Sequence, residues 1–551
     1  MLVVIAMLTL GTATYLDLMQ NERKAVRHHG RSVKAARLAE SGAEYVKTVL
    51  ALTPAEIQQA GGLLANPTTM QAVIVDDQSD PFDRGRFTIL SPAQVDGLYA
   101  GFKYGLENES AKLNVNTLLA PGAEEEAVNR LLALPGMTIE IADAILDWLD
   151  ADEAPRTNGA EFEVYQQLVP PYEPRNGPIA DLDELLLVRG ITPELLYGVD
   201  QNRNFQIEPH EAPRGLLVEL DNADGSLNRG WSAYLTVSSV ENFQQSPSTG
   251  AAASTSTALA RLDLNGQNLQ QLYTSLQSVV GDDMAKFIIV YRQYGGQPID
   301  QGQNGQPPLP GSTIGGGSTS GSTGSSSSST SGGSPPTSGT PGAGASQAVS
   351  VAASSLQLNF EQQGGNQINS PLELVGMRVQ VPGQDNQPAK NVDSPWLDNA
   401  STYRELLTFY DAILPGRARR VAGRVSINAA SRPVLRSIPG LPATAIGRIV
   451  ARRELEPDLV LSDQRHAIWL LIEGIVTLQE MKQIERYVTT GGDAFSGQVV
   501  GFFDAGPSAV RGEFVIDRSG TSPRLRAWRD LSPLGRGFTT QQLGVEAETS
   551  R

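Results

Sequence analysis

The residues best suited to chemistry are acidic side chains gathered in one short stretch. Asp147, Asp150, Asp152 and Glu161 belong to the sequence DWLDADEAPRTNGAEFEVY. Hard divalent cations such as calcium take several oxygen ligands from carboxylates and carbonyls, which a loop folded back on itself can supply. The four residues therefore predict a calcium site, although their spacing is not that of an EF-hand loop. A solvated acidic loop is the alternative explanation.

No other pattern predicts catalysis. The chain has no cysteine, and its four histidines stand in no metal-ligand spacing. It contains neither a nucleophile elbow nor a phosphate-binding glycine loop. We therefore expect a protein that is not an enzyme.

Two related segments resemble a nucleic-acid-binding motif. In residues 134–152 and 438–454 a hydrophobic-Pro-Gly-hydrophobic turn leads into a helix, as in a helix-hairpin-helix unit. Such units present backbone N–H groups to phosphate, but the second glycine of the turn is Thr138 in one copy and Pro442 in the other. Proline has no N–H to donate, and a net charge of -17 disfavours binding to a polyanion.

The second copy is nevertheless rich in arginine. Arg424, Arg448 and Arg452 could bind phosphate, and the chain would then be a membrane-tethered DNA-binding or DNA-uptake protein. Two alternatives explain these arginines without a nucleic acid. They could lie on a solvated face, or they could pair with the acidic first copy within the same chain.

An internal repeat organises the elements that must position these residues. The segments LNVN, LDLN and VSIN end at Asn116, Asn265 and Asn428, and each precedes a pair of helices. Because an asparagine side chain can accept a backbone N–H at a helix start, we expect these three to cap the following helices. Small helical hairpins of this kind bury a core only in combination.

The N-terminus predicts one long helix. Residues 1–16 are apolar, and from Arg31 to Leu52 apolar residues recur at helical spacing without a break. The apolar run is shorter than a spanning helix usually requires, so a signal-peptide core and a buried helix are alternatives. No basic stretch precedes the run, which favours a helix anchored at one end in a bilayer.

The remaining patterns predict strands and one flexible segment. Alternating residues at 86–90 and 97–116, and three tail segments after residue 490, indicate antiparallel strands. Residues 298–350 are almost entirely Gly, Ser, Thr and Pro, a composition typical of disorder.

These features together resemble the minor pseudopilin K family of type II secretion systems. The resemblance rests on ARLAESGAEY at 36–45, KLNVN, AILDWLDAD with GAEFEVY, and PYEPRNGPIADLDELLLVRGI at 171–191, in that order. It implies an α+β fold with a membrane-anchored N-terminal helix, a pilin-like antiparallel sheet and inserted helical domains. The helical domains would be built from helix-hairpin-helix or SAM-like repeats.

The resemblance also implies a function. Such a protein would sit at the tip of a periplasmic pseudopilus, bound to minor pseudopilins I and J and other pseudopilus subunits, and would start assembly and help export folded proteins. It would be a single-pass inner-membrane protein with its soluble domains in the periplasm. Calcium sites known in the family's helical domain match Asp147, Asp150, Asp152 and Glu161.

The chain departs from the family pattern at its start. Family members begin with a short basic leader ending in glycine, which a prepilin peptidase removes, and none precedes the apolar run. We expect either a misassigned start or a nearly mature form, with prepilin peptidase as a partner if an upstream leader exists.

The sequence predicts nine segments. They are a long helix at 1–52, pilin-like strands at 53–112, a first repeat at 113–200, a strand with a second repeat at 201–297, a linker at 298–350, strands at 351–402, a third repeat at 403–490, antiparallel strands at 491–535 and a tail at 536–551.

Overall fold

The computed structural model describes all of the chain except residues 122, 210, 212–228, 244–260, 300–348, 384–387, 414–419, 455–461 and 546–551. Two compact units are present, one formed by Met1–Asp263 with Asn399–Arg551 and the other by Leu264–Asp398. The nine predicted segments are finer than this division, and their boundaries remain predictions. Most of the predicted linker at 298–350 lies outside the described residues.

The first unit is built on an antiparallel sheet. Its strand order is β1-β2-β15-β16-β17, with β3 paired to β2 and β4 paired to β15. The strands are β1 (Val73–Asp76), β2 (Gly85–Val95), β3 (Leu98–Lys103), β4 (Glu107–Asn108), β15 (Ala494–Phe503), β16 (Ala509–Asp517) and β17 (Arg524–Asp530). The three predicted tail strands are thus confirmed, and strands from near the two ends of the chain share one sheet.

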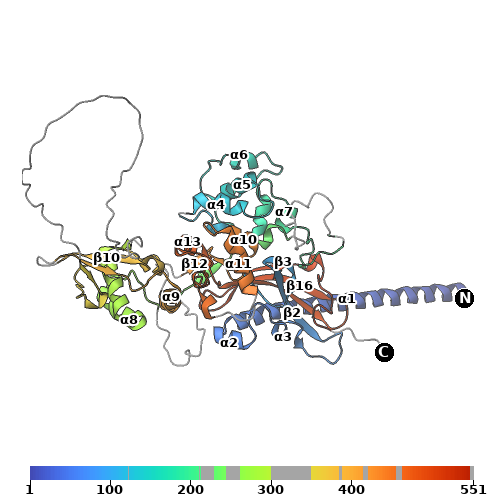
Figure 1. Cartoon of the computed structure of the whole chain (residues 1–551). Helices are drawn as coiled ribbons and strands as arrows, with labels where there is room; N and C mark the ends of the chain where they lie inside the picture. The colour runs from blue at the N-terminus through green and yellow to red at the C-terminus, as the bar shows by residue number, and fades with distance from the viewer. Residues whose placement is uncertain are drawn as a thin grey trace, which may run out of the picture. The chain divides into compact units, whose positions relative to one another are not determined.

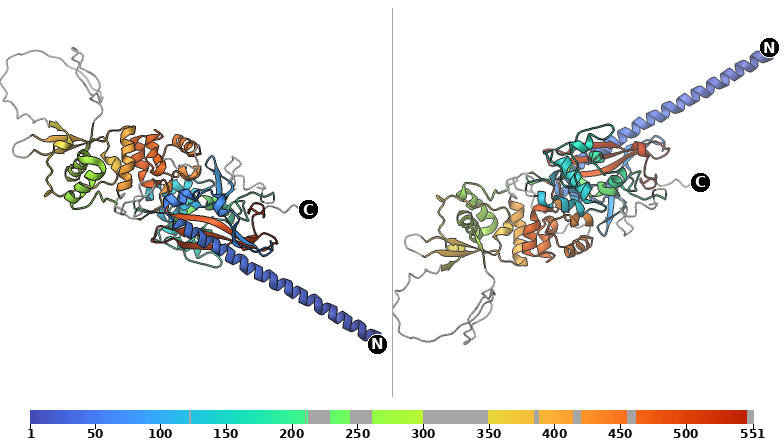
Figure 2. Two further views of the ribbon diagram at one scale, coloured as in Figure 1. Left: turned by 90° about the horizontal axis from the view of Figure 1, so that it is seen from below. Right: turned by 90° about the horizontal axis from the view of Figure 1, so that it is seen from above.

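Helix α1 (Leu2–Leu50) packs its second half on this sheet (Figure 1). Ala39 and Val46 lie against Phe87 of β2 and Val499 of β15 in a buried apolar core. At Gly501 of β15, an added Cβ would lie 2.2 Å from the carbonyl oxygen of Ala35, so helix and strand backbones are in direct contact. The first half of α1 projects away from the sheet in both further views (Figure 2).

The long N-terminal helix is confirmed, but its expected crossing of a membrane is not. Among the described residues, no helix combines the length and the apolarity that a bilayer crossing requires. The physical reason is the sequence itself, because the apolar run ends at Asp17 after 16 residues.

Short helices and strands fill the chain between β4 and β15 in this unit. The helices are α4 (Glu124–Leu132), α5 (Ile139–Leu149), α6 (Phe162–Tyr165), α7 (Pro193–Tyr197), α9 (Ala400–Ala412), α10 (Arg432–Arg436), α11 (Ala443–Glu454), α12 (Trp469–Ile472) and α13 (Leu478–Ile484), with α2 (Pro54–Gln59) and α3 (Pro67–Met70) preceding β1. Paired short strands are β5 (Leu113–Asn114) with β6 (Leu235–Thr236), β7 (Val240–Asn242) with β12 (Arg420–Ala422), and β13 (Val425–Ser426) with β14 (Val488–Thr489).

One-turn 3-10 helices occur at several junctions of the first unit. They are η1 (Glu109–Ala111), η2 (Val115–Thr117), η3 (Leu182–Leu187), η5 (Gly230–Ala233), η8 (Ser462–Arg465), η9 (Glu485–Tyr487) and η10 (Ser532–Leu534).

The second unit combines one helix with a small sheet. Helix α8 (Leu269–Tyr294) is interrupted at Gly281, whose φ of 78° is non-helical. The sheet order is β8 (Gln297–Pro298), β10 (Met377–Val381), β11 (Lys390–Asp393) and β9 (Val349–Val351), and the unit also contains η6 (Ala353–Ser355) and η7 (Pro371–Leu374). The described chain is therefore an α+β fold, as predicted.

The three repeat asparagines do not cap helices, so that prediction was wrong. Helix α4 starts after Ala123, α8 after Asn268 and α10 after Ser431. Each repeat asparagine instead binds a later segment of its own unit, where it satisfies backbone groups that a loop would otherwise leave unpaired.

The bonds made by two of these asparagines are nearly identical. The amide of Asn116 donates to the carbonyl of Ile179 (2.9 Å) and accepts from the N–H of Ile179 (2.9 Å). Asn265 makes the same two bonds with Ile368, both at 2.9 Å. Asn428 differs, since it donates to the carbonyl of Gln464 and accepts from the indole N–H of Trp469, both at 3.0 Å.

Candidate functional site

The acidic loop folds back on the end of α5 as the calcium prediction requires. The carboxylate of Asp147 is fully buried and accepts the backbone N–H of Ala160 at 2.8 Å. A side chain at Gly159 would collide with this carboxylate, because an added Cβ would lie 1.8 Å from Oδ2. Asp147, the first residue of the acidic cluster, thus holds the far end of the loop against α5.

One arginine neutralises part of the cluster. Nη1 of Arg156 lies 2.8 Å from Oδ1 of Asp147 and also contacts Asp150. Asp152 is exposed, and its carboxylate accepts the N–H of Ala154 at 2.9 Å, which stabilises the local turn. The structure therefore brings Asp147 and Asp150 together around a cationic group.

Glu161 is buried without a partner. Glu161 directly precedes α6 and is 4% exposed, and neither of its carboxylate oxygens makes a hydrogen bond. Burial, together with the nearby carboxylates of Asp147, Asp150 and Asp152, raises the pKa of Glu161 to about 7. A buried anionic oxygen of this kind fits a cation, which would supply the missing charge.

A complete metal site is not preformed. Among the described residues, no three or more His, Cys, Asp or Glu side chains are arranged so that they could hold a metal ion. Arg156 occupies the space between Asp147 and Asp150 with a positive charge of its own. Calcium binding at Asp147, Asp150, Asp152 and Glu161 stays a prediction.

The arginines of the second turn-helix segment are engaged within the protein. Nη1 of Arg424 lies 3.2 Å from Glu241, and Nη2 of Arg452 lies 3.4 Å from Glu473. The guanidinium of Arg448 donates to the carbonyls of Glu473 and Ile475. These contacts match the intramolecular explanation of the arginine pattern better than phosphate binding.

A buried charged cluster joins the sheet to the inserted helical part. Lys112 lies 2.9 Å from Glu107 and 3.0 Å from Glu109, and all three side chains are less than 10% exposed. Tyr99 donates to Glu107 at 2.8 Å, and Ser496 of β15 donates to Glu109 at 2.5 Å. Burial disfavours the charge of Glu109, but Lys112 and the hydroxyl donors outweigh it and lower its pKa.

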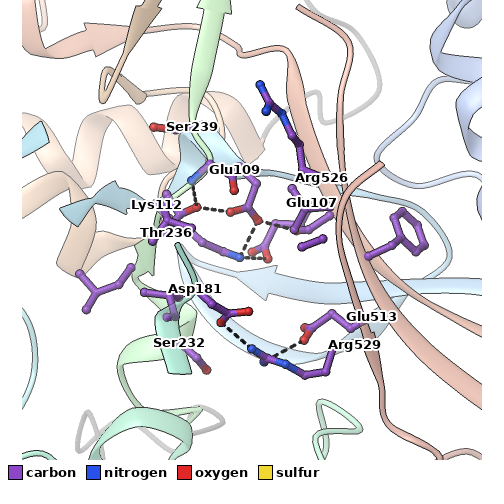
Figure 3. Close-up of a pocket in the computed structure, with 18 of the residues that line it drawn as sticks. Glu107, Glu109, Lys112, Asp181, Ser232, Thr236, Ser239, Glu513, Arg526 and Arg529 are labelled. Carbon is purple, nitrogen blue, oxygen red and sulfur yellow. Dashed lines mark hydrogen bonds and ion pairs between the residues drawn. The ribbon is translucent and has the colours of Figure 1, made fainter. Parts of the chain in front are cut away.

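This cluster borders a cavity of about 640 Å³. Elsewhere on the wall, Arg529 of β17 bridges Asp181 at 2.7 Å and Glu513 at 3.3 Å (Figure 3). Lys112 with its two glutamates, and Arg529 with Asp181 and Glu513, form the ion pairs drawn there, and those of Arg529 join elements far apart in the sequence. The cavity wall is therefore a junction of ion pairs, and the hydroxyls of Ser496 and Thr236 on it donate to Glu109, whose charge Lys112 balances.

One polar loop next to this cavity was missed by reasoning from the sequence. Asp200 begins it and Glu211 ends it, and both carboxylates are buried. The regular spacing of Asp and Asn from residue 200 onward is the pattern that could have revealed it.

Comparison with known families identifies part of the chain. Residues 111–199 match the family described as type II secretion system (T2SS), protein K, in its first domain. The resemblance predicted from the sequence is confirmed over this region, which contains α4 to α7 and the acidic loop.

Curated relatives match a similar share of the chain. The putative type II secretion system protein K of Escherichia coli (strain K12) is 34% identical over 15% of this chain and 27% of its own length. Type II secretion system protein K of Pectobacterium carotovorum subsp. carotovorum is 32% identical over 21% of this chain and 35% of its own. The chain thus spans about a third or less of the relatives that it matches.

A solved structure aligns over more of the chain but only weakly. The crystal structure of the GspK-GspI-GspJ complex from the enterotoxigenic Escherichia coli type 2 secretion system aligns with 93% of this chain and 98% of its own. The two are 10% identical, with a TM-score of 0.33. A likeness of this size does not establish a shared overall fold.

Proposed function

We propose that the chain is a minor pseudopilin of a type II secretion system, a structural subunit with no enzymatic activity. The observation that carries the proposal is the family match at residues 111–199. This segment lies between β4 and β15 of an antiparallel sheet on which a long N-terminal helix packs. A helix on a sheet with a helical insertion is the architecture that the resemblance implies.

The proposed place of the subunit is the tip of the periplasmic pseudopilus. There it would bind minor pseudopilins I and J, help to start assembly and help to export folded proteins. The first half of α1 supports a role in binding other helices, because the large apolar side chains described there are exposed. Leu8, Leu10, Leu16 and Leu18 are each more than half exposed. Exposed apolar surface of this kind needs a partner or a lipid environment.

The proposed location is the inner membrane, with the rest of the chain in the periplasm. The same apolar end of α1 would hold the protein there, in contact with lipid and with the helices of other subunits. Fractionation of cells and protease accessibility in spheroplasts test this location. Recovery of the intact chain in the soluble cytoplasmic fraction would contradict it.

We further propose that the acidic loop binds calcium through Glu161, Asp147, Asp150 and Asp152. The unpaired buried oxygens of Glu161 support this, since a bound cation would neutralise a carboxylate that the protein leaves without a donor. The ion would hold the turn between α5 and α6 and would have no catalytic part. Its role is structural, like that of the rest of the proposed subunit.

Genetic complementation tests the function directly. The gene is deleted in its host, and the deletion strain is supplied with the wild-type chain or with a variant carrying Leu8→Asp and Leu16→Asp in α1. We expect secretion of type II substrates to be lost in the deletion, restored by the wild type and not restored by the double variant. Glu405→Gln on the exposed side of α9 is the matched control and should restore secretion. Secretion that continues unchanged in the deletion strain would overturn the proposal.

A further inference from the structure

A twelve-residue loop after α7 has the ligand spacing of a calcium-binding loop. It reads DQNRNFQIEPHE from Asp200 to Glu211. An EF-hand loop takes ligands from its positions 1, 3, 5, 7, 9 and 12, with Asp or Asn at the first three and a bidentate Glu at the last. Positions 1, 3, 5 and 12 of this loop are Asp200, Asn202, Asn204 and Glu211.

The other two ligand positions also fit. Position 7 contributes a backbone carbonyl, which any residue supplies, and position 9 is Glu208. We propose that Asp200, Asn202, Asn204, Glu208 and Glu211, with the carbonyl of Gln206, form a calcium site that is separate from the acidic loop after α5. None of its ligand positions is shared with Asp147, Asp150, Asp152 or Glu161, and the inference does not depend on the proposed function.

The backbone adopts the turn that such a loop needs at its sixth position. EF-hand loops have glycine there because the chain must turn sharply. Phe205 occupies this position, and its φ of 65° lies in the left-handed region that glycine usually provides. The aromatic ring is 2% exposed and packs near Phe538, so burial of the ring compensates for the strained backbone.

The loop gathers its ligand side chains in the structure. Asp200 accepts the N–H groups of Asn204 at 3.0 Å and Phe205 at 2.8 Å. From the far end, Glu211 reaches back to accept the N–H of Asn202 at 3.1 Å. Glu211 also accepts the N–H of Glu208 at 3.1 Å, so the first and last ligand positions both bind backbone groups inside the loop.

Burial of this charge points to a cation. Asp200 is 2% exposed and Glu211 is 4% exposed, and in the described part of the chain their carboxylates bind backbone N–H groups and no cationic side chain within 4 Å. Arg229 and Arg511 act on Asp200 electrostatically, but neither forms an ion pair with it within 4 Å among the residues that the structure describes. Carboxylates buried in this way normally require a paired cation or a metal.

A second buried group next to the loop also lacks a partner. Gln498 of β15 is 1% exposed, and its Nε2 donates to the carbonyl of Arg203, at position 4 of the loop, at 2.8 Å. The Oε1 atom of the same amide has no hydrogen-bond partner. The amide that touches the loop thus carries a buried oxygen without a partner, which a bound ion or its water would satisfy.

The loop also connects the helical insertion to the sheet. Arg511 of β16 donates to the carbonyl of Asn202 at 2.5 Å, and Asn204 donates to the carbonyl of Gly537 at 2.8 Å. A bound calcium ion would fix both contacts by holding Asn202 and Asn204 as ligands. It would therefore hold the loop after α7 against β16 and the C-terminal segment.

Calcium titration of the full chain tests the site. Isothermal titration calorimetry is run on the calcium-free wild type and on Glu211→Gln, Asn202→Asp and Glu405→Gln. We expect Glu211→Gln to lose one site or to weaken it by roughly tenfold or more, since the bidentate ligand is removed. Asn202→Asp keeps the oxygen that accepts the N–H of Asn204 and adds a charge, so it should bind calcium more tightly. Glu405→Gln should behave as the wild type.

The two calcium proposals are distinguished by Glu161→Gln in the same assay. A site lost in Glu211→Gln but kept in Glu161→Gln assigns calcium to residues 200–211, whatever happens at the acidic loop. Circular dichroism without calcium checks that each variant folds. If Glu211→Gln fails to fold, the gain in affinity of Asn202→Asp decides. Wild-type stoichiometry and affinity in both folded variants would overturn the inference.

Discussion

Replacing Lys112 by methionine should destabilise the first unit strongly. The ammonium lies 2.9 Å from Glu107 and 3.0 Å from Glu109, and the two carboxylates are 7% and 6% exposed. Removing one partner from a buried ion pair costs about 3–5 kcal/mol, because the remaining charge is left without compensation. Tyr99, Ser496 and a threonine hydroxyl still donate to the carboxylates, so we expect about 3 kcal/mol.

The loss of stability in Lys112→Met should depend on pH. The folded pKa of Glu109 is lowered, so its contribution to stability is present above its unfolded pKa and is lost as the pH falls through the folded value. The folded pKa of Lys112 is raised, because the two glutamates outweigh burial. Its contribution is complete below the unfolded pKa and is lost only as the pH rises through the folded value. The deficit of Lys112→Met should therefore be largest near neutral pH and smaller in acid.

Urea unfolding followed by tryptophan fluorescence measures the effect, since Trp231 is buried in η5 of the same unit. The control is Lys47→Met, which removes an ion pair with Glu44 at 2.9 Å on the surface of α1. An exposed pair contributes about 0–1 kcal/mol, so this control should change stability little. Equal stabilities of Lys112→Met and Lys47→Met at pH 7 would refute the reasoning.

Three further results are expected. Gly501→Ala should lower the free energy of unfolding by about 1–3 kcal/mol or more, because the Cβ of the alanine would collide with backbone atoms of α1. An unchanged urea midpoint would argue against direct contact between the two backbones. Asn116→Ala should cost about 1–3 kcal/mol by leaving both backbone groups of Ile179 unpaired, and a loss below 0.5 kcal/mol would show that water replaces the amide. Without calcium, the pKa of Glu161 is about 7 in the folded chain and near 4.3 in the unfolded chain, so thermal stability should fall as the pH rises between these values. Glu161→Gln should abolish this pH dependence. If the variant keeps it, another group is its origin.

Local patterns in the sequence predicted individual elements well. The helical spacing after Arg31 predicted the part of α1 that packs on the sheet, and the alternation after residue 490 predicted β15, β16 and β17. Such patterns depend on neighbours along the chain. They could not show that β15 pairs with β2, because Val499 and Ile89 meet across about four hundred residues.

Long-range contacts also explain the errors at the candidate sites. Asn116 has a type and a position that suit helix capping, but its partner Ile179 lies beyond α4, α5 and α6. Asp147 lies in α5 and the other three acidic residues follow it, and the neutralising role of Arg156 depends on the turn that brings it to Asp147. The loop from Asp200 to Glu211 is local, and its spacing alone would have been enough to predict it.

Cross-linking from α1 in living cells tests the central claim most directly. A photoreactive amino acid is placed at Leu16, which is 57% exposed, and for comparison at Leu397, which is 55% exposed in the second unit. If the chain is a minor pseudopilin, irradiation should join the Leu16 variant to pseudopilin I or J of the same host, with no such product from Leu397. Absence of both pseudopilins from the Leu16 products, in cells that express them, would contradict the account.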